Sequence, residues 1–195
     1  RERGVVGQRG GAAGEGGADE RDGELHNEDA AMLRAAARDP RLPPFLVIAP
    51  TSVVANWSAE LTRFAPSLRT TVLTSTKDSV ANAARDSHVV LTSYALLRLD
   101  ADAYRGVEWA GVVMDEAQFV KNRRSRTHLA AKRVRAGMRL AITGTPMENS
   151  LDDLWAILDL VAPGLLGTAI GFRKRFTLPI ATGEAPQRME QLRRR

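Results

Sequence analysis

Short runs of apolar, largely β-branched residues recur along this chain and alternate with segments of helical periodicity. Five runs have the length of buried strands, and they occupy residues 45–49, 70–73, 88–92, 110–115 and 139–143. Strands that are apolar on both faces belong in a parallel sheet with helices on each side. The sequence therefore predicts an α/β fold with a mostly parallel sheet flanked by helices, in which 110–115 is a central, rigid strand.

Helical spacing predicts three helices around these strands. Trp57 falls on one face of the first with Val53, Val54, Leu61 and Phe64, and the spacing of Trp155 likewise places it in the core. Residues 129–134 indicate a second helix with a basic flank. The third, over 150–161, opens with Ser150 three residues before Asp153, which resembles a capping box.

The chain divides into three parts by composition. Residues 1–44 are Gly-rich and charged, which predicts disorder except for a possible short helix over 29–38 that stops at Pro40. Residues 45–180 form the predicted domain, and 181–195 form a basic tail. Residues 1–44 hold 7 Lys and Arg against 9 Asp and Glu, and the remainder holds 21 against 14, a net charge of +7. A basic body favours a polyanionic partner, although such a surface also simply serves solubility.

The sequence disfavours a protein with a Cys or His metal cluster and a protein that spans a membrane. It has no cysteine, and its three histidines (His26, His88 and His128) are too scattered for a metal cluster, so we interpret them as structural or solvated. No apolar run is long enough for a membrane span. We expect a monomeric cytoplasmic protein without membrane contact, associated with the nucleoid if its source is bacterial.

Asp115 and Glu116 follow the apolar run "AGVVM". In open parallel sheets ligands bind at the carboxyl ends of strands. A strand-end Asp can hold Mg²⁺ through water, and the next carboxylate can activate an attacking water. A pair of acids that merely starts a loop or caps a helix is the alternative.

Several further stretches occur in a fixed order: "APTSVVANW" (49–57), "LTSY" (91–94), "MDEAQFVKN" (114–122), "LAITGTPMENSLDDLWAILDLVAPGLLG" (140–167) and "FRKRF" (172–176). Together they resemble the conserved segments of the SWI/SNF-type helicase-like ATPases of superfamily two. The resemblance covers about residues 45–180 and implies the first RecA-like lobe, with ATP and Mg²⁺ as ligands.

The resemblance assigns roles to individual residues. Asp115 corresponds to the magnesium-binding acid, Glu116 to the residue that activates water, and Gln118 completes a DEAQ box in which many relatives carry His. An amide does not titrate near neutral pH, so coupling through Gln118 should be insensitive to pH. Three residues at the end of the strand 139–143 resemble the segment that links nucleotide to DNA: Thr143, Gly144 and Thr145.

Double-stranded DNA is the partner that the resemblance implies, with a DNA-bound protein as a possible target. Hydroxyls and backbone amides that follow two strands suit phosphates, although ordinary helix caps explain them too. A basic loop after the acid pair adds candidates, with a solvated face as the alternative. The predicted DNA contacts are Pro50, Thr51, Ser52, Thr92, Ser93, Tyr94, Lys121, Asn122, Arg123 and Asn149.

One expected element is missing from the sequence. No G-x-x-x-x-G-K-[ST] phosphate loop occurs, and upstream of Phe45 the chain reads "GQRGGAAGEGGADERDGE" instead. We expect this 5′ part to be aberrant, for example frame-shifted. The chain also ends before any second lobe with arginine fingers, so we expect negligible ATP hydrolysis by this polypeptide alone.

Three functional hypotheses follow. The chain is part of a DNA-dependent ATPase and translocase, or a DNA-binding module without catalysis, or a remnant that folds poorly because it lacks the strand and helix of the phosphate loop.

Overall fold

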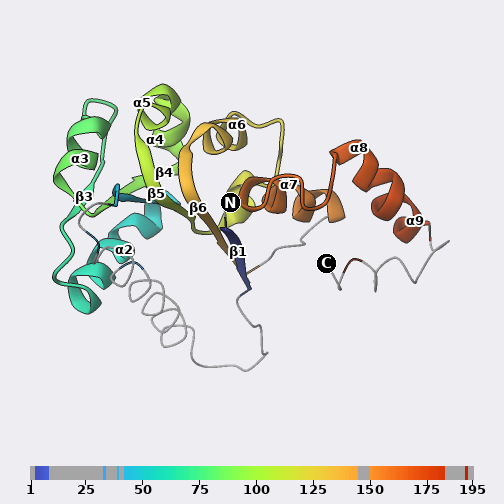
Figure 1. Ribbon diagram of the computed structural model, residues 1–195, viewed down its shortest axis with the longest axis horizontal. Helices are drawn as coiled ribbons and strands as arrows, with labels where there is room; N and C mark the ends of the chain where they lie inside the picture. The colour runs from blue at the N-terminus through green and yellow to red at the C-terminus, as the bar shows by residue number, and fades with distance from the viewer. Residues whose placement is uncertain are drawn as a thin grey trace.

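A single parallel sheet organises the computed structural model, which describes residues 3–8, 33, 39, 42–144, 150–182 and 192 (Figure 1). Within these ranges six strands lie in the order β1-β6-β5-β2-β4-β3, and every neighbouring pair is parallel. The strands are β1 (Arg3–Gln8), β2 (Phe45–Ala49), β3 (Thr70–Val72), β4 (Val89–Ser93), β5 (Glu108–Met114) and β6 (Arg135–Thr143). The predicted parallel α/β fold is confirmed.

All five predicted strands are present; β2 has the predicted bounds, and the other four have shifted ends. β6 begins four residues before its predicted start, where the alternating exposed and half-buried residues 135–138 still pair with β5. β5 lies between β6 and β2, and Val112, Val113 and Met114 are buried. Burial of each such side chain stabilises the fold by about 1.5–3 kcal/mol. The prediction that this strand is central is therefore confirmed.

β1 corrects the prediction that residues 1–44 are disordered and that packing begins at Phe45. It pairs with the outer edge of β6, with Val5 opposite Leu140 and Val6 opposite Ala141. Leu33 is also fully buried, against the cluster beneath α2. Composition failed here because an edge strand gains its backbone hydrogen bonds from a neighbour far along the chain. Apart from Leu33, the predicted helix 29–38 lies outside the described residues.

Helices cover both faces of the sheet. α2 (Thr51–Phe64) covers one face, while α4 (Tyr94–Leu99), α5 (Ala101–Arg105), α6 (Arg126–Arg133) and α7 (Leu151–Val161) lie on the other (Figure 1). The remaining described helices are short: α3 (Val80–Asp86), the 3₁₀ turn η1 (Ala117–Val120), α8 (Ala169–Phe172), the π-helical turn η2 (Arg173–Thr177) and α9 (Leu178–Ala181).

Alternation along the strands divides the core into two layers. Phe45 and Val47 of β2 pack toward α2, whereas Leu46 and Ile48 pack toward α4–α7. A smaller cluster around Trp155, Phe172 and Phe176 holds α8 and η2 against α7. These side chains confirm that both faces of the sheet are covered.

The three predicted helices form, and their packing refines the prediction. Trp57 is fully buried, and Trp155 is buried in the small cluster with Phe172 and Phe176. The second helix ends at Arg133, and Leu129 is exposed rather than on its packed face. Ser150 caps α7 by accepting a hydrogen bond from the Asp153 amide at 3.3 Å, as predicted.

Two histidines are structural, as predicted, and His26 lies outside the described residues. The His128 ring Nδ1 is 2.7 Å from the Val120 carbonyl oxygen, and His88 Nδ1 accepts a hydrogen bond from the Arg69 amide at 3.0 Å. Burial lowers the pKa of both rings; the nearby charge of Arg69 also lowers the pKa of His88, whereas the Val120 hydrogen bond opposes the effect at His128.

Acidification should therefore destabilise the fold. The folded state favours the neutral rings, so the unfolded chain binds more protons; this stability is present above about pH 6.5 and is lost as pH falls through the folded-state pKa values. We expect urea unfolding at pH 5.5 to give a lower free energy than at pH 7.5, with a smaller difference in His128→Asn. An unchanged difference in that variant would contradict a contribution from His128.

In the part of the chain that the structure describes, no helix combines the length and apolarity needed to cross a bilayer.

Candidate functional site

The carboxyl ends of the strands bring most of the predicted site residues to one edge of the sheet. Asp115 follows β5 directly, and Thr51 follows β2 after Pro50. Thr143 ends β6, and Gly144 follows it. Because all strands are parallel, these positions face the same edge. Thr145 and Asn149 lie outside the described residues.

Asp115 is fully buried and tightly held. Its Oδ2 accepts a hydrogen bond from the Trp57 indole Nε1 at 2.9 Å, and its Oδ1 accepts one from the Glu116 amide at 2.8 Å. The Asp115 amide donates to the Ile48 carbonyl of β2 at 2.9 Å, which continues the sheet by one residue. The Asp115 carboxylate is thus held by α2 and by the Glu116 amide, and the Asp115 backbone is held by the sheet.

Glu116 adopts a left-handed backbone conformation with φ of 50°, the one positive φ at a non-glycine residue among those described. This conformation is uncommon for residues with a side chain, and it persists where surrounding contacts enforce it. It marks the turn between the end of β5 and the 3₁₀ turn η1. The turn therefore depends on the contacts that hold Asp115.

A hydrogen-bond relay joins the acid pair to the end of β6. Gln118 Nε2 donates to Glu116 Oε2 at 2.8 Å, and Thr143 Oγ1 donates to Gln118 Oε1 at 2.9 Å. Thr143 is fully buried, so its side chain reaches the acid pair through Gln118 and does not present a hydroxyl to a ligand. The prediction that Thr143 belongs to the nucleotide site stays a prediction.

Tyr94 holds the same turn from α4. Its hydroxyl donates to the Asp115 carbonyl oxygen at 2.8 Å, and its ring stacks on Phe119 with centroids 5.5 Å apart. Burial, followed by the nearby charges of Asp115 and Glu116, raises the pKa of Tyr94 well above its usual value. The hydroxyl therefore stays protonated, and remains a donor, throughout the neutral range.

Tyr94→Phe tests this contact, because it removes the hydroxyl and keeps the ring. The buried Asp115 carbonyl would lose its donor, and such a loss costs about 1–3 kcal/mol of unfolding free energy. Urea denaturation measures the difference. Tyr104→Phe is a matched control for loss of a buried tyrosine hydroxyl away from the acid pair, since that group contacts Thr92. Stability equal to the unaltered chain in Tyr94→Phe would contradict the role of the hydroxyl.

The predicted DNA contacts after β4 are buried in this conformation, and their contact with DNA stays a prediction. Thr92 Oγ1 lies 2.6 Å from the Tyr104 hydroxyl and is fully buried, and Tyr94 points into the acid-pair turn. Ser93 is buried and caps α4 by accepting from the Leu96 amide at 3.2 Å. Of the three, Ser93 has the contact that the helix-cap alternative expects.

The start of α2 is different. Thr51 and Ser52 are exposed in its first turn, and Pro50 gives no side-chain cap to the helix. A helix N-terminus with exposed hydroxyls and backbone amides suits an anion such as a phosphate.

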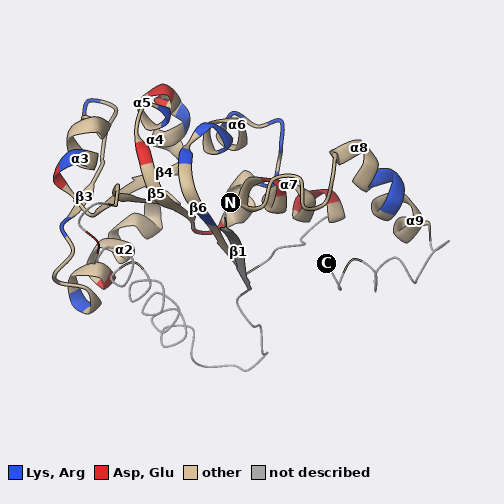
Figure 2. Cartoon of the chain, viewed as in Figure 1, with Lys and Arg blue, Asp and Glu red and all other residues tan. Residues whose placement is uncertain are grey.

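The basic loop after η1 divides into residues with different surroundings. Lys121 is 24% exposed and its Nζ lies 3.9 Å from Asp153 Oδ2, so its charge is directed toward α7. Asn122 and Arg123 are exposed. Asn122 Oδ1 accepts from the Arg124 amide at 3.0 Å, which shapes the loop. Lysines and arginines gather on this loop, on α6 and on η2 (Figure 2).

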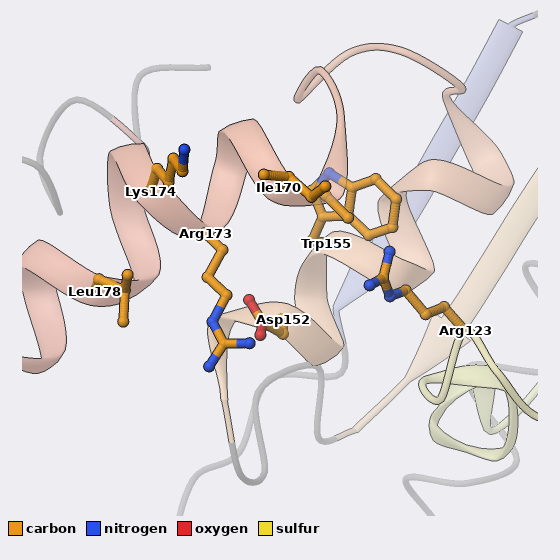
Figure 3. A pocket seen from close by; sticks show the side chains of 8 residues that line it. Arg123, Asp152, Trp155, Ile170, Arg173, Lys174 and Leu178 are labelled. Carbon is orange, nitrogen blue, oxygen red and sulfur yellow. The ribbon is translucent and has the colours of Figure 1, made fainter.

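Arg123 turns toward α7. Its guanidinium carbon lies 6.0 Å from the centre of the Trp155 ring, and both side chains line a pocket of about 310 Å³ with Asp152, Ile170, Arg173, Lys174 and Leu178 (Figure 3). Asp152 accepts a hydrogen bond from the Thr177 hydroxyl at 2.8 Å. Arg123 thus belongs to a basic surface that extends from the loop to η2.

The acid pair fits the donor chemistry of Mg-ATP. Mg²⁺ in nucleotide sites is held by one or two carboxylates together with phosphates and water, and Asp115 and Glu116 are two carboxylates at the ligand-binding edge. Among the described residues no group of three His, Cys, Asp or Glu could hold a metal, so an ion would depend on phosphate ligands. Asp115 is enclosed in this conformation, and its contact with a metal-bound water requires the neighbouring segments to open. The glycine-rich residues 9–32 lie outside the described residues.

Trp57 is the functional residue that sequence reasoning missed. Its spacing placed it in the core, where it lies, but its hydrogen bond to Asp115 was not predicted. A signal was present, because a buried indole N–H needs an acceptor and an otherwise apolar core offers few side-chain acceptors.

Comparison with known proteins gives consistent matches. A model of the SNF2-related domain matches residues 13–195. The putative ATP-dependent helicase/translocase YwqA of Bacillus subtilis is 39% identical over 153 residues, which cover 76% of this chain and 17% of that protein. The TATA-binding protein-associated factor MOT1 of Saccharomyces cerevisiae is 33% identical over 160 residues, which cover 80% of this chain and 8% of that protein.

Solved structures show the same likeness. The Sulfolobus solfataricus SWI2/SNF2 ATPase core in complex with double-stranded DNA has a TM-score of 0.75 and 36% identity, covering 93% of this chain and 36% of that one. The core domain from the same organism has a TM-score of 0.73 and 39% identity, covering 85% and 34%. The chain thus spans about a third of these cores and less than a fifth of the two sequence relatives.

Proposed function

The chain belongs to the SNF2-related domain family, and from that premise we propose that it is part of a DNA-dependent ATPase and translocase, which couples Mg-ATP hydrolysis to movement on double-stranded DNA. Its helicase-like lobe is proposed to run over residues 45–180, with β1 added to the sheet. A DNA-bound protein is the proposed target of the longer protein.

The observation that carries this proposal is the relay at the carboxyl edge. Asp115 and Glu116 end the central strand, and Gln118 links Glu116 to Thr143 at the end of the neighbouring strand. Bound Mg²⁺ would neutralise phosphate charge. Asp115 would hold the ion through water, Glu116 would orient a water and take its proton, and Gln118 would connect this chemistry to β6 without titrating near neutral pH.

Duplex DNA would contact the exposed groups that remain from the predicted set. These are Thr51 and Ser52 at the start of α2 and the loop residues Asn122 and Arg123. Hydroxyls, backbone amides and an arginine are groups that fix a phosphate backbone without reading sequence. Lys121 would add positive charge to this surface, and its ammonium group lies beside the Asp153 carboxylate.

Duplex binding should depend steeply on salt. If about four phosphates are neutralised, log K falls with log salt at a slope near −3.5, so the affinity drops about 100-fold between 50 and 200 mM. Fluorescence anisotropy of a labelled 20-base-pair duplex measures the slope. Arg123→Gln should reduce the slope by about 1. Arg85→Gln on α3, an exposed arginine paired with Asp86, is the matched control and should leave it unchanged.

A DNA-binding module without catalysis is the second candidate, favoured by the missing phosphate-loop sequence. Duplex binding with the predicted slope supports either candidate. ATP turnover by the longer protein of which this chain is proposed to be part, abolished by Glu116→Gln, separates them. Salt-independent association together with a non-cooperative melt would instead favour the poorly folded remnant.

A further inference from the structure

α2 joins two groups that the proposed function treats separately. Thr51 and Ser52 lie in its first turn, and Trp57, six residues after Thr51, donates its indole N–H to Asp115 Oδ2 at 2.9 Å. Trp57 and Asp115 are both fully buried. The helix therefore carries an exposed candidate phosphate contact at one end and a buried contact to the proposed metal-holding acid about 9 Å further along its axis.

We infer that Trp57 is a positioning residue through which duplex binding at the start of α2 acts on the Asp115 carboxylate. This inference rests on the proposed function, since it needs duplex to contact Thr51 and Ser52. It adds a defined route between the two proposed sites, made by one hydrogen bond between side chains 58 residues apart.

The geometry explains why this bond would respond to small movements. Asp115 is fixed to the sheet, because its amide donates to Ile48 of β2 and its carbonyl accepts from Tyr94. Trp57 belongs to α2, on the same buried face as Val54 and Leu61, so its indole would follow any displacement of the helix. A displacement of α2 by about 0.6 Å along the bond would lengthen it to about 3.5 Å, beyond normal hydrogen-bond range.

The indole N–H of Trp57 also has a fixed role in this hydrogen bond. It is a donor only, so it holds Asp115 Oδ2 by donating to it and cannot accept a hydrogen bond in return. A hydrogen bond to a charged group is worth about twice a neutral one. Loosening or tightening this bond would therefore change the orientation and electron density of the oxygen that Asp115 presents toward a metal-bound water.

Nuclear magnetic resonance can observe this bond directly in the 195-residue chain. The ¹⁵N-labelled protein has three indole N–H signals, from Trp57, Trp109 and Trp155, which Trp→Phe variants assign. Trp109 donates to the Tyr104 carbonyl at 3.0 Å and is the internal control. Asp115→Asn should shift the Trp57 signal and leave the Trp109 signal in place, and the Trp57 indole proton of the unaltered chain should exchange slowly with solvent.

Duplex titration then tests the transmission. Saturation with an unlabelled 20-base-pair duplex should shift the Trp57 signal, with no change at Trp109. In the double variant Thr51→Ala/Ser52→Ala, duplex held by the basic loop should saturate at a higher concentration and leave the Trp57 signal at its free position. Both substitutions are at exposed sites, so the fold should persist.

The outcomes separate the inference from the proposed function. Duplex that binds, by anisotropy, without moving the Trp57 signal overturns the inference and leaves DNA binding in place. An equal shift in the double variant overturns the route through the start of α2. A complete absence of duplex binding overturns both proposals.

Discussion

Incubated alone with Mg-ATP and duplex DNA, the 195-residue polypeptide is expected to release phosphate about 10³ to 10⁵ times more slowly than a relative with both lobes. Arginine fingers contribute a factor of this size where they have been measured. The sequence also contains no G-x-x-x-x-G-K-[ST] loop to cradle the β-phosphate. Without that loop, Asp115 and Glu116 would be in place, but little ATP would be bound for them to act on.

A phosphate-release assay with matched variants gives the test. Glu116→Gln removes the proposed base, and Glu108→Gln makes the same change at the opposite end of the same strand, where the side chain is exposed. Both should equal the slow rate of the unaltered chain. Vigorous duplex-stimulated turnover that Glu116→Gln abolishes and Glu108→Gln preserves would contradict the expectation, and would show that this polypeptide is a complete catalyst.

Trp57→Ala is expected to lower the free energy of unfolding by about 3–5 kcal/mol, the range for a buried large aromatic side chain. The indole is fully buried between α2 and the sheet, so truncation leaves a cavity in the layer beneath α2. It also removes the donor that Asp115 Oδ2 uses. Loss of stability on this scale would leave much of a marginally stable domain unfolded.

Two further variants divide this effect into its parts. Trp57→Phe keeps a ring but loses the hydrogen bond to a charged group, which costs about 1.5–3 kcal/mol. Asn56→Ala changes an exposed neighbour on the same helix and should stay within about 0.5 kcal/mol. Urea denaturation of all three measures the differences. If Trp57→Phe were as stable as the unaltered chain, the hydrogen bond to Asp115 would contribute no net stability.

The sequence predicted the sheet because each core strand is apolar over its whole length. Residues 45–49 and 110–114 are β-branched or otherwise apolar, so they are buried whichever face they present, and only a parallel sheet covered on both sides satisfies them. The acid pair was predicted for the same local reason, since Asp115 is the first residue after such a strand. Ser150 as the cap of α7 is another contact between near neighbours.

Contacts between distant residues were decided by the tertiary structure alone. β1 forms because the outer edge of β6 offers it backbone partners, which its own composition does not reveal. Thr92 and Tyr94 carry hydroxyls that suit either a phosphate or a buried partner, and the packing of α4 and α5 gave them Tyr104 and Asp115. Trp57 contacts Asp115 because α2 packs on the face of the sheet next to the end of β5. Periodicity and strand-end position are properties of consecutive residues, whereas the partner of a buried polar group depends on which elements the fold brings together.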